Sequence, residues 1–161
     1  MFREMRRKRQ LLSDEESIEI LKNGTSGVLA LLGDEEYPYA VPISYIYEDH
    51  KILFHAAKEG HKIDAIRKCN KASFCVIAQD KIVPEEYTTY YKSVIVFGKI
   101  RILEDQDEIG RAIEKLAIKY HPEDSGINRS QEIARGWSAL CMIELSIEHM
   151  TGKGAKEIIK K

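Results

Sequence analysis

The stretch from 54 to 64 holds residue types whose spacing could bind a phosphate group. An apolar, strand-like run ends there, Gly60 permits a tight turn, and a helix is expected to start at about His61. The first N–H groups of a helix have no acceptor within it and together carry roughly half a positive charge. Lys58 and Lys62 add cationic donors around the same turn. The spacing predicts a phosphate site, with an ordinary solvated loop as the alternative interpretation.

A second unusual segment is 38–47, where Pro42 interrupts a run of residues typical of a β-strand. Proline cannot donate to a β-ladder, so we expect this strand to be bulged or paired on one side only. A bulge would leave neighbouring backbone groups free to bond a flat heteroaromatic ring. The alternative is an edge strand that its proline protects from further pairing.

Several common functional motifs are absent from the sequence. It has neither a G-x-G-x-x-G nor a G-x-x-x-x-G-K-[ST] nucleotide loop, and no G-x-S-x-G elbow. Its histidines form no H-E-x-x-H motif, and its cysteines form no pair at zinc spacing. We therefore expect no metal site, and we exclude the usual hydrolase and structural-zinc classes.

Composition narrows the class of protein further. The chain has 161 residues, 43% of them apolar and 32% charged, with a net charge of −1. This balance predicts one globular domain over 1–161 and argues against a nucleic-acid-binding protein that relies on bulk charge. The longest purely apolar run, 28–32, is far shorter than the roughly 20 residues that a membrane helix needs, so no membrane association is expected.

The cysteines and the first residues indicate the compartment. Three cysteines without a C-x-x-C pair are typical of reduced thiols in the cytoplasm, and we expect Cys75 and Cys141 in the core. The basic N-terminal segment 1–12 is followed by acidic residues rather than an apolar stretch, so it does not predict export. A lysine-rich tail, 153–161, ends the chain.

Periodicity predicts a mainly β protein with peripheral helices. Ser13 and Glu16 form a capping box that opens a helix ending at about Asn23. Further helices are expected over 61–69 and 106–120, with a weaker one near 130–135. Because no regular βαβ alternation occurs, the strand runs favour a six-stranded antiparallel barrel. The expected strands are 26–32, 38–47, 51–57, 72–78, 91–103 and 138–149.

Five segments, taken in order, carry a resemblance that spans nearly the whole chain. The sequence resembles the FMN-binding split-barrel family related to pyridoxamine 5'-phosphate oxidase, and within it the nitroimidazole-resistance (Nim-type) branch. The matching segments are 5–8, 39–45, 54–62 (Phe-His-Ala-Ala leading to Gly-His-Lys), 91–99 and 149–153.

The resemblance implies a split β-barrel that forms a homodimer with FMN at the interface. It implies that the backbone of Val41, Pro42, Ile43 and Ser44 faces the isoalloxazine edge. His61 and Lys62 then hold the phosphate, with Ala57, Lys58 and Gly60 in the same turn. Histidine stands where the oxidases have arginine, which weakens one expected phosphate contact. Ser93 and Trp137 are expected to reach FMN from elsewhere on the dimer, although Trp137 is equally typical of a core or interface anchor.

His55 is the candidate catalytic residue that the resemblance implies, because the matching histidine of the Nim-type branch lies beside the flavin. Its imidazole would donate a proton or hold an anionic substrate; a packed histidine within the barrel is the alternative. The expected function is an FMN-dependent reductase that passes electrons to a small acceptor. A non-enzymatic flavin carrier or redox sensor, a haem-binding split barrel and a deazaflavin-dependent reductase remain alternatives. Vitamin B6 oxidation is not expected, because the basic C-terminal substrate motif of the true oxidases is missing.

Overall fold

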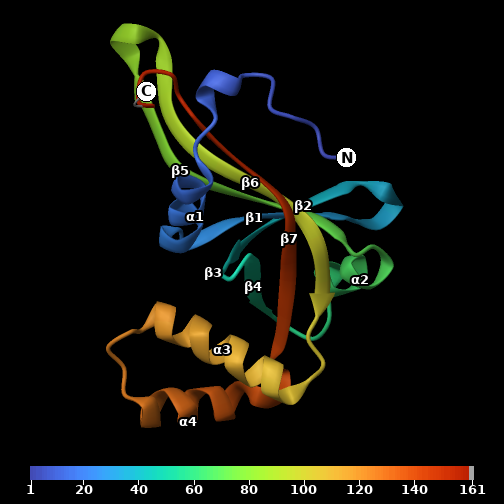
Figure 1. The fold of residues 1–161 in the computed structure, drawn as a ribbon. Helices are drawn as coiled ribbons and strands as arrows, with labels where there is room; N and C mark the ends of the chain where they lie inside the picture. The colour runs from blue at the N-terminus through green and yellow to red at the C-terminus, as the bar shows by residue number, and fades with distance from the viewer. Residues whose placement is uncertain (160–161) are drawn as a thin grey trace.

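The computed structural model describes residues 1–159, which form one antiparallel sheet with helices around it (Figure 1). The strands lie in the order β2-β1-β5-β6-β7-β4-β3, so β2 and β3 are its edges. Short 3-10 turns cover Lys8–Gln10, Asp34–Glu36, Pro84–Glu86 and Trp137–Ala139. The α-helices are α1 (Asp14–Asn23), α2 (His61–Lys68), α3 (Gln106–Tyr120) and α4 (Gly126–Gly136). The strands are β1 (Ser26–Leu32), β2 (Pro38–Ser44), β3 (Ile46–Glu48), β4 (Lys51–Ala56), β5 (Lys71–Val83), β6 (Thr88–Ile102) and β7 (Cys141–Gly154).

The mainly β class with peripheral helices is confirmed, but the prediction of six strands is wrong. The expected strand 38–47 is divided at Tyr45 into β2 and β3, which pair with different neighbours, β1 and β4. Tyr45 is fully buried, and its hydroxyl donates to the carbonyl of Leu21 at 2.7 Å. Its own carbonyl accepts from Lys119 Nζ at 3.1 Å. These bonds turn the chain from one edge of the sheet to the other, and within residues 1–159 no ladder joins β2 to β3, so the sheet stays open.

Pro42 lies on the edge strand β2, which agrees with the second interpretation of this segment, an edge strand, rather than with a bulge. The β1–β2 register runs from Ser26 opposite Ser44 to Leu32 opposite Pro38 without a shift, so no bulge occurs at Pro42. Pairing on one side alone accommodates the missing N–H.

Of the other predicted elements, some are confirmed and some have different bounds. The capping box is confirmed, since the Glu16 N–H donates to Ser13 Oγ at 3.1 Å and the Ser13 N–H donates to Glu16 Oε2 at 2.9 Å. The weak helix near 130–135 is the full helix α4. The strands β5 and β6 extend past the rest of the sheet as a hairpin, whose far residues pair only with each other.

Two hydrophobic clusters hold these elements together. The larger fills the inside of the curled sheet and includes Phe54, Phe74 and Leu145 together with residues of α1 and α2. The smaller lies on the other face of β4 and β7, where Leu53 and Met142 pack against α3. Since side chains alternate along a strand, His55 is on the same face of β4 as Leu53, toward α3.

Candidate functional site

The turn between β4 and α2 has the features of an anion site. Gly60 precedes the helix with φ of +122°, a conformation that favours glycine, and an added Cβ would find no heavy atom within 4 Å. The Asp64 N–H donates to the Gly60 carbonyl at 3.1 Å, which leaves the N–H groups of residues 61–63 without acceptors in the helix. The space beside Gly60, where these donors begin, is open.

The side chain of His61 is engaged elsewhere. Its Nε2 accepts a hydrogen bond from the Asp34 N–H at 3.2 Å, and its ring stacks on Tyr39 with centroids 4.1 Å apart. Lys68 binds the Asp34 carboxylate at 3.1 Å, and this hydrogen bond, together with the charge of Lys68, lowers the pKa of Asp34. The contacts tie α2 to the β1–β2 connection, so Nε2 does not donate toward a ligand in this arrangement.

Three cations lie near Cys141, and two of them belong to the turn and the start of α2. We call Lys58, Lys62 and Arg67 the cationic cluster. Burial raises the pKa of the nearby Cys141 thiol, and the positive charges of Arg67, Lys58 and Lys62 oppose that rise. Arg67 lies 3.8 Å from Asp64, whereas Lys58 and Lys62 form no ion pair with any residue in 1–159. The cluster therefore keeps positive charge that the protein does not neutralise.

Sequence reasoning missed Arg67. It lies in the last turn of α2, away from the glycine that marks the phosphate turn. Its position near Cys141 depends on how α2 packs against β1 and β6, which the local spacing does not encode.

A cavity of about 380 Å³ adjoins the cationic cluster, and we call it the Trp137 cavity. It brings the predicted residues Lys58 and Trp137 together with Arg67 and Cys141. Leu140 forms part of its wall and also part of the wall of a second hollow of about 370 Å³, the His55 cavity. His55 is exposed on β4 and lines that second hollow, so it is not packed inside the barrel.

The remaining predicted residues lie away from both cavities. Val41 and Ile43 turn their side chains toward the core, while Pro42 and Ser44 are exposed on the other face of β2. Ser93 of β6 is paired with Ile77 and Lys153. Neither the 41–44 segment nor Ser93 lines a cavity with Lys58 in a single chain.

The outer face of the sheet carries exposed apolar side chains. Pro42, Val28, Cys75 and Ile95 lie in register across four neighbouring strands, and Val28 and Ile95 are 39% and 40% exposed. Phe97, also 40% exposed, follows in the next row. Cys75 is therefore a half-buried residue of this face, and its prediction as a core residue is wrong because β5 turns it outward; Cys141 is buried, as predicted.

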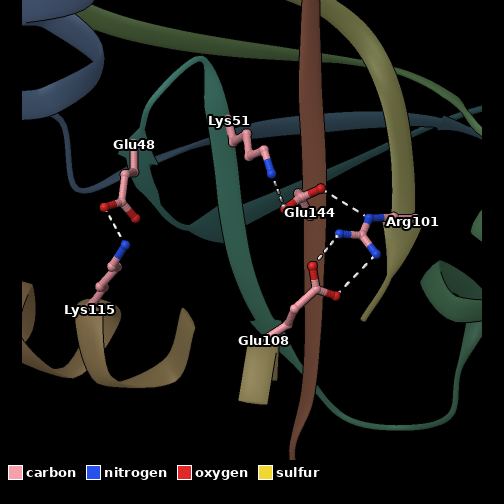
Figure 2. A network of polar contacts seen from close by, with 6 residues as sticks. All are labelled: Glu48, Lys51, Arg101, Glu108, Lys115 and Glu144. Atoms are coloured by element: carbon pink, nitrogen blue, oxygen red, sulfur yellow. Dashed lines mark hydrogen bonds and ion pairs between the residues drawn. The ribbon is translucent and has the colours of Figure 1, made fainter. Parts of the chain in front are cut away.

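A separate group of charges lies where α3 covers the sheet (Figure 2). The side chain of Glu144 is only 8% exposed and accepts from Arg101 Nε and Lys51 Nζ, each at 3.0 Å. Arg101 also donates twice to Glu108 of α3, at 3.0 and 3.3 Å, and Lys115 pairs with Glu48. Its charges bind one another, so the group is a structural network rather than a ligand site.

In the part of the chain that the structure describes, no group of three or more histidine, cysteine, aspartate or glutamate side chains could hold a metal ion. No helix within 1–159 is long and apolar enough to cross a membrane.

Comparison with solved structures identifies similar folds. A conserved hypothetical protein from Mycobacterium tuberculosis, Rv2991, is 14% identical, with a TM-score of 0.81 over 98% of this chain and 95% of that one. A candidate 5-nitroimidazole antibiotic resistance protein from Bacteroides thetaiotaomicron is 20% identical, with a TM-score of 0.76 over 89% and 85%. An FAD and heme binding protein from Mycobacterium smegmatis is also 20% identical, with a TM-score of 0.73 over 91% and 73%.

The sequence itself decides the family. No curated protein sequence matches this chain. The family model described as pyridoxamine 5'-phosphate oxidase matches residues 13–154, which run from the cap of α1 to the end of β7. This chain therefore belongs to the pyridoxamine 5'-phosphate oxidase family.

Proposed function

We propose that this protein binds FMN and acts as a flavin-dependent oxidoreductase that passes electrons to a small acceptor. The observation that carries the proposal is the cationic cluster beside the Trp137 cavity. Its members Lys58 and Lys62 form no ion pair within residues 1–159 and flank the start of α2, where the first N–H groups have no acceptor in the helix. A phosphate monoester needs such a set of backbone donors and positive charges. Family membership and the flavin named in a structural relative support the same cofactor class.

The residues present fit a flavin mononucleotide. The N–H groups of residues 61–63 and the ammonium groups of Lys58 and Lys62 would bind the phosphate, while Trp137 and Leu140 would offer an apolar wall. FMN, when bound, supplies hydride and electron transfer. His55 would contact the acceptor and hold or donate a proton at its ring nitrogen.

We further propose a homodimer in the cytoplasm. The exposed apolar row across β2, β1, β5 and β6 is the kind of surface that a second copy covers. Pairing through this face would surround the 41–44 segment and Ser93 with partner residues. Three free cysteines suit a reducing compartment. Sedimentation analysis of the protein and of Ile95→Lys tests the dimer, since a buried lysine would shift it to monomer.

The absorption spectrum of the purified protein is the first test of the flavin. We expect flavin bands, or their recovery on adding FMN. A colourless protein that does not bind added FMN would overturn the proposal, and a Soret band with added haem would point to haem binding instead.

Turnover separates an enzyme from a carrier. With reduced nicotinamide nucleotide as donor and a nitroaromatic compound as acceptor, an oxidoreductase consumes the donor at a rate that scales with protein concentration. Flavin binding with negligible turnover of this and other small acceptors would favour a carrier or redox sensor.

A further inference from the structure

Helix α4 is well formed but stands off the body of the protein. Its N-terminus is capped by Ser125, which accepts from the Asn128 N–H at 3.0 Å. None of its residues is buried, unlike those of α1, α2 and α3. Hollows lie on both sides of it, one of about 680 Å³ against the first half of α3 and the His55 cavity of about 370 Å³ against the second half. In Figure 1 the two helices form an open hairpin below the sheet.

One part of the wall of the His55 cavity is apolar. Ile113 and Ala117 of α3 face Ile133 and Gly136 of α4, and Leu140 lies between them and the sheet. His55 projects into this space from β4. Apolar walls with a few polar groups and a volume of a few hundred Å³ are typical of a small-molecule site.

The charges around the cavity are already used. Arg129 donates to the Asp124 carbonyl at 3.3 Å and lies 4.0 Å from the Glu114 carboxylate. Asn128 Nδ2 donates to both carboxylate oxygens of Asp124 at 3.0 Å. Glu132 also lies in the lining, where its carboxylate accepts from Arg135 Nη1 at 2.6 Å. With its arginine paired and two carboxylates in the lining, the cavity does not favour an anion.

Two hydrogen-bonding side chains are left for a ligand. Within residues 1–159, neither His55 nor Tyr120 forms a side-chain hydrogen bond or ion pair, whereas His121, which also lines the cavity, lies 4.0 Å from the Asp124 carboxylate. An imidazole and a phenol can each donate to a carbonyl oxygen. The chemistry therefore suits a neutral, flat molecule with oxygen acceptors at its ends.

We propose that the His55 cavity binds a neutral single-ring quinone or a similar aromatic carbonyl compound, hydrogen-bonded to His55 and Tyr120. That this ligand is the electron acceptor rests on the proposed function, since the cavity shares Leu140 with the Trp137 cavity where the flavin is proposed. The binding itself rests on the cavity alone.

Fluorescence of the single tryptophan, Trp137, tests this site, because Trp137 and Ile133 together line the hollow on the other side of α4. The full-length protein is titrated with tetramethyl-1,4-benzoquinone, which quenches nearby tryptophan, and separately with benzoate as an anionic ring of similar width. We expect saturable quenching by the quinone and at least about tenfold weaker binding of benzoate.

Variants locate the binding. Ile133→Phe fills the cavity and should raise the quinone Kd more than about tenfold, and His55→Ala should raise it about fivefold by removing one donor. Ile127→Phe is the matched control, since Ile127 is 76% exposed on the same helix and outside the lining. It should leave Kd within about twofold. His55→Ala replaces an exposed side chain, so it keeps the test valid if Ile133→Phe does not fold.

Quenching that does not saturate, or that is equal in all variants, would overturn the proposal. A second result would also overturn it: the parent protein binds no quinone, and Ile133→Phe converts the dimer to a monomer. A second copy of the chain would then occupy the cavity. FMN titration of the same samples separates the two proposals: quinone binding without FMN binding removes the flavin role alone, and FMN binding without quinone binding removes this site alone.

Discussion

Two groups of charges in this molecule behave in opposite ways. Beneath α3, Glu144 is buried and held by Arg101 and Lys51, and each charge there has a partner (Figure 2). At the start of α2, Lys58 and Lys62 have no carboxylate partner among residues 1–159, and the first N–H groups of the helix beside them have no acceptor within it. Paired and buried charges hold elements together, whereas charges left unpaired beside free donors are available to a ligand. The difference predicts that mutations should affect stability in the first group and binding in the second.

The largest effect is expected from the pair Lys58→Ala and Lys62→Ala. A charge-assisted hydrogen bond contributes about 1.5–3 kcal/mol, so losing two should weaken FMN binding at least about 100-fold. Stability should change by less than about 0.5 kcal/mol, because neither lysine has an ion pair to lose. Flavin fluorescence titration and urea unfolding measure the two quantities.

The control for that pair is Lys81→Ala with Lys99→Ala, which removes the same charge from exposed positions on β5 and β6. Equal loss of FMN affinity in both pairs would mean that net charge alone attracts the phosphate. His61→Ala sharpens the comparison. It should weaken FMN binding less than the change of Lys58 and Lys62 does, because His61 Nε2 accepts from the Asp34 N–H.

Arg101→Met should have the largest effect on stability. It leaves the buried Glu144 carboxylate with Lys51 alone and removes both bonds to Glu108, at a cost of about 3 kcal/mol. Chemical unfolding measures this cost, and FMN affinity should stay within about twofold. Lys99→Met, an exposed change on the same strand, should cost less than about 0.5 kcal/mol. If the two variants unfold alike, the network does not stabilise α3.

Gly60→Ala tests the backbone of the phosphate turn. With φ of +122° and ψ of 172°, this residue occupies a region that is essentially restricted to glycine, so alanine should cost about 1–3 kcal/mol. An added Cβ meets nothing within 4 Å, so the cost would come from the backbone alone. Gly136→Ala, at an equally open position with negative φ, should be neutral or slightly stabilising. Urea unfolding of both variants gives the comparison, and equal stability would contradict it.

The smallest effect is the pH dependence from Glu144. Burial raises the pKa of this carboxyl, but the hydrogen bonds and charges of Arg101 and Lys51 outweigh it and hold the pKa below the ordinary 4.5. A lowered pKa means that the charged form favours the folded state, so its contribution is present above about pH 4.5 and is lost as the pH falls through the folded value. Urea midpoints between about pH 3 and 7 should therefore fall less steeply on acidification in Glu144→Gln than in the parent. Parallel curves would show that other carboxyls carry the acid sensitivity.

The sequence by itself determined the local elements, including the glycine turn from which we predicted a phosphate site. The capping box at Ser13, the break at Gly60 and the apolar spacing of α3 depend on near neighbours in the chain, so composition and period predicted them. The family could also be predicted from the sequence, because the segments that resemble it extend in order along nearly the whole chain.

Only the tertiary structure decided which residues share a cavity and which face solvent. The bonds of Tyr45 to Leu21 and Lys119, far apart in sequence, divide a predicted strand in two and give the sheet its second edge. The orientation of β5 places Cys75 on the outer face of the sheet, and the packing of α2 against β1 and β6 brings Arg67 to the cavity that Trp137 also lines. Local patterns do not encode these positions, because each depends on contacts between segments that the chain brings together only when it folds.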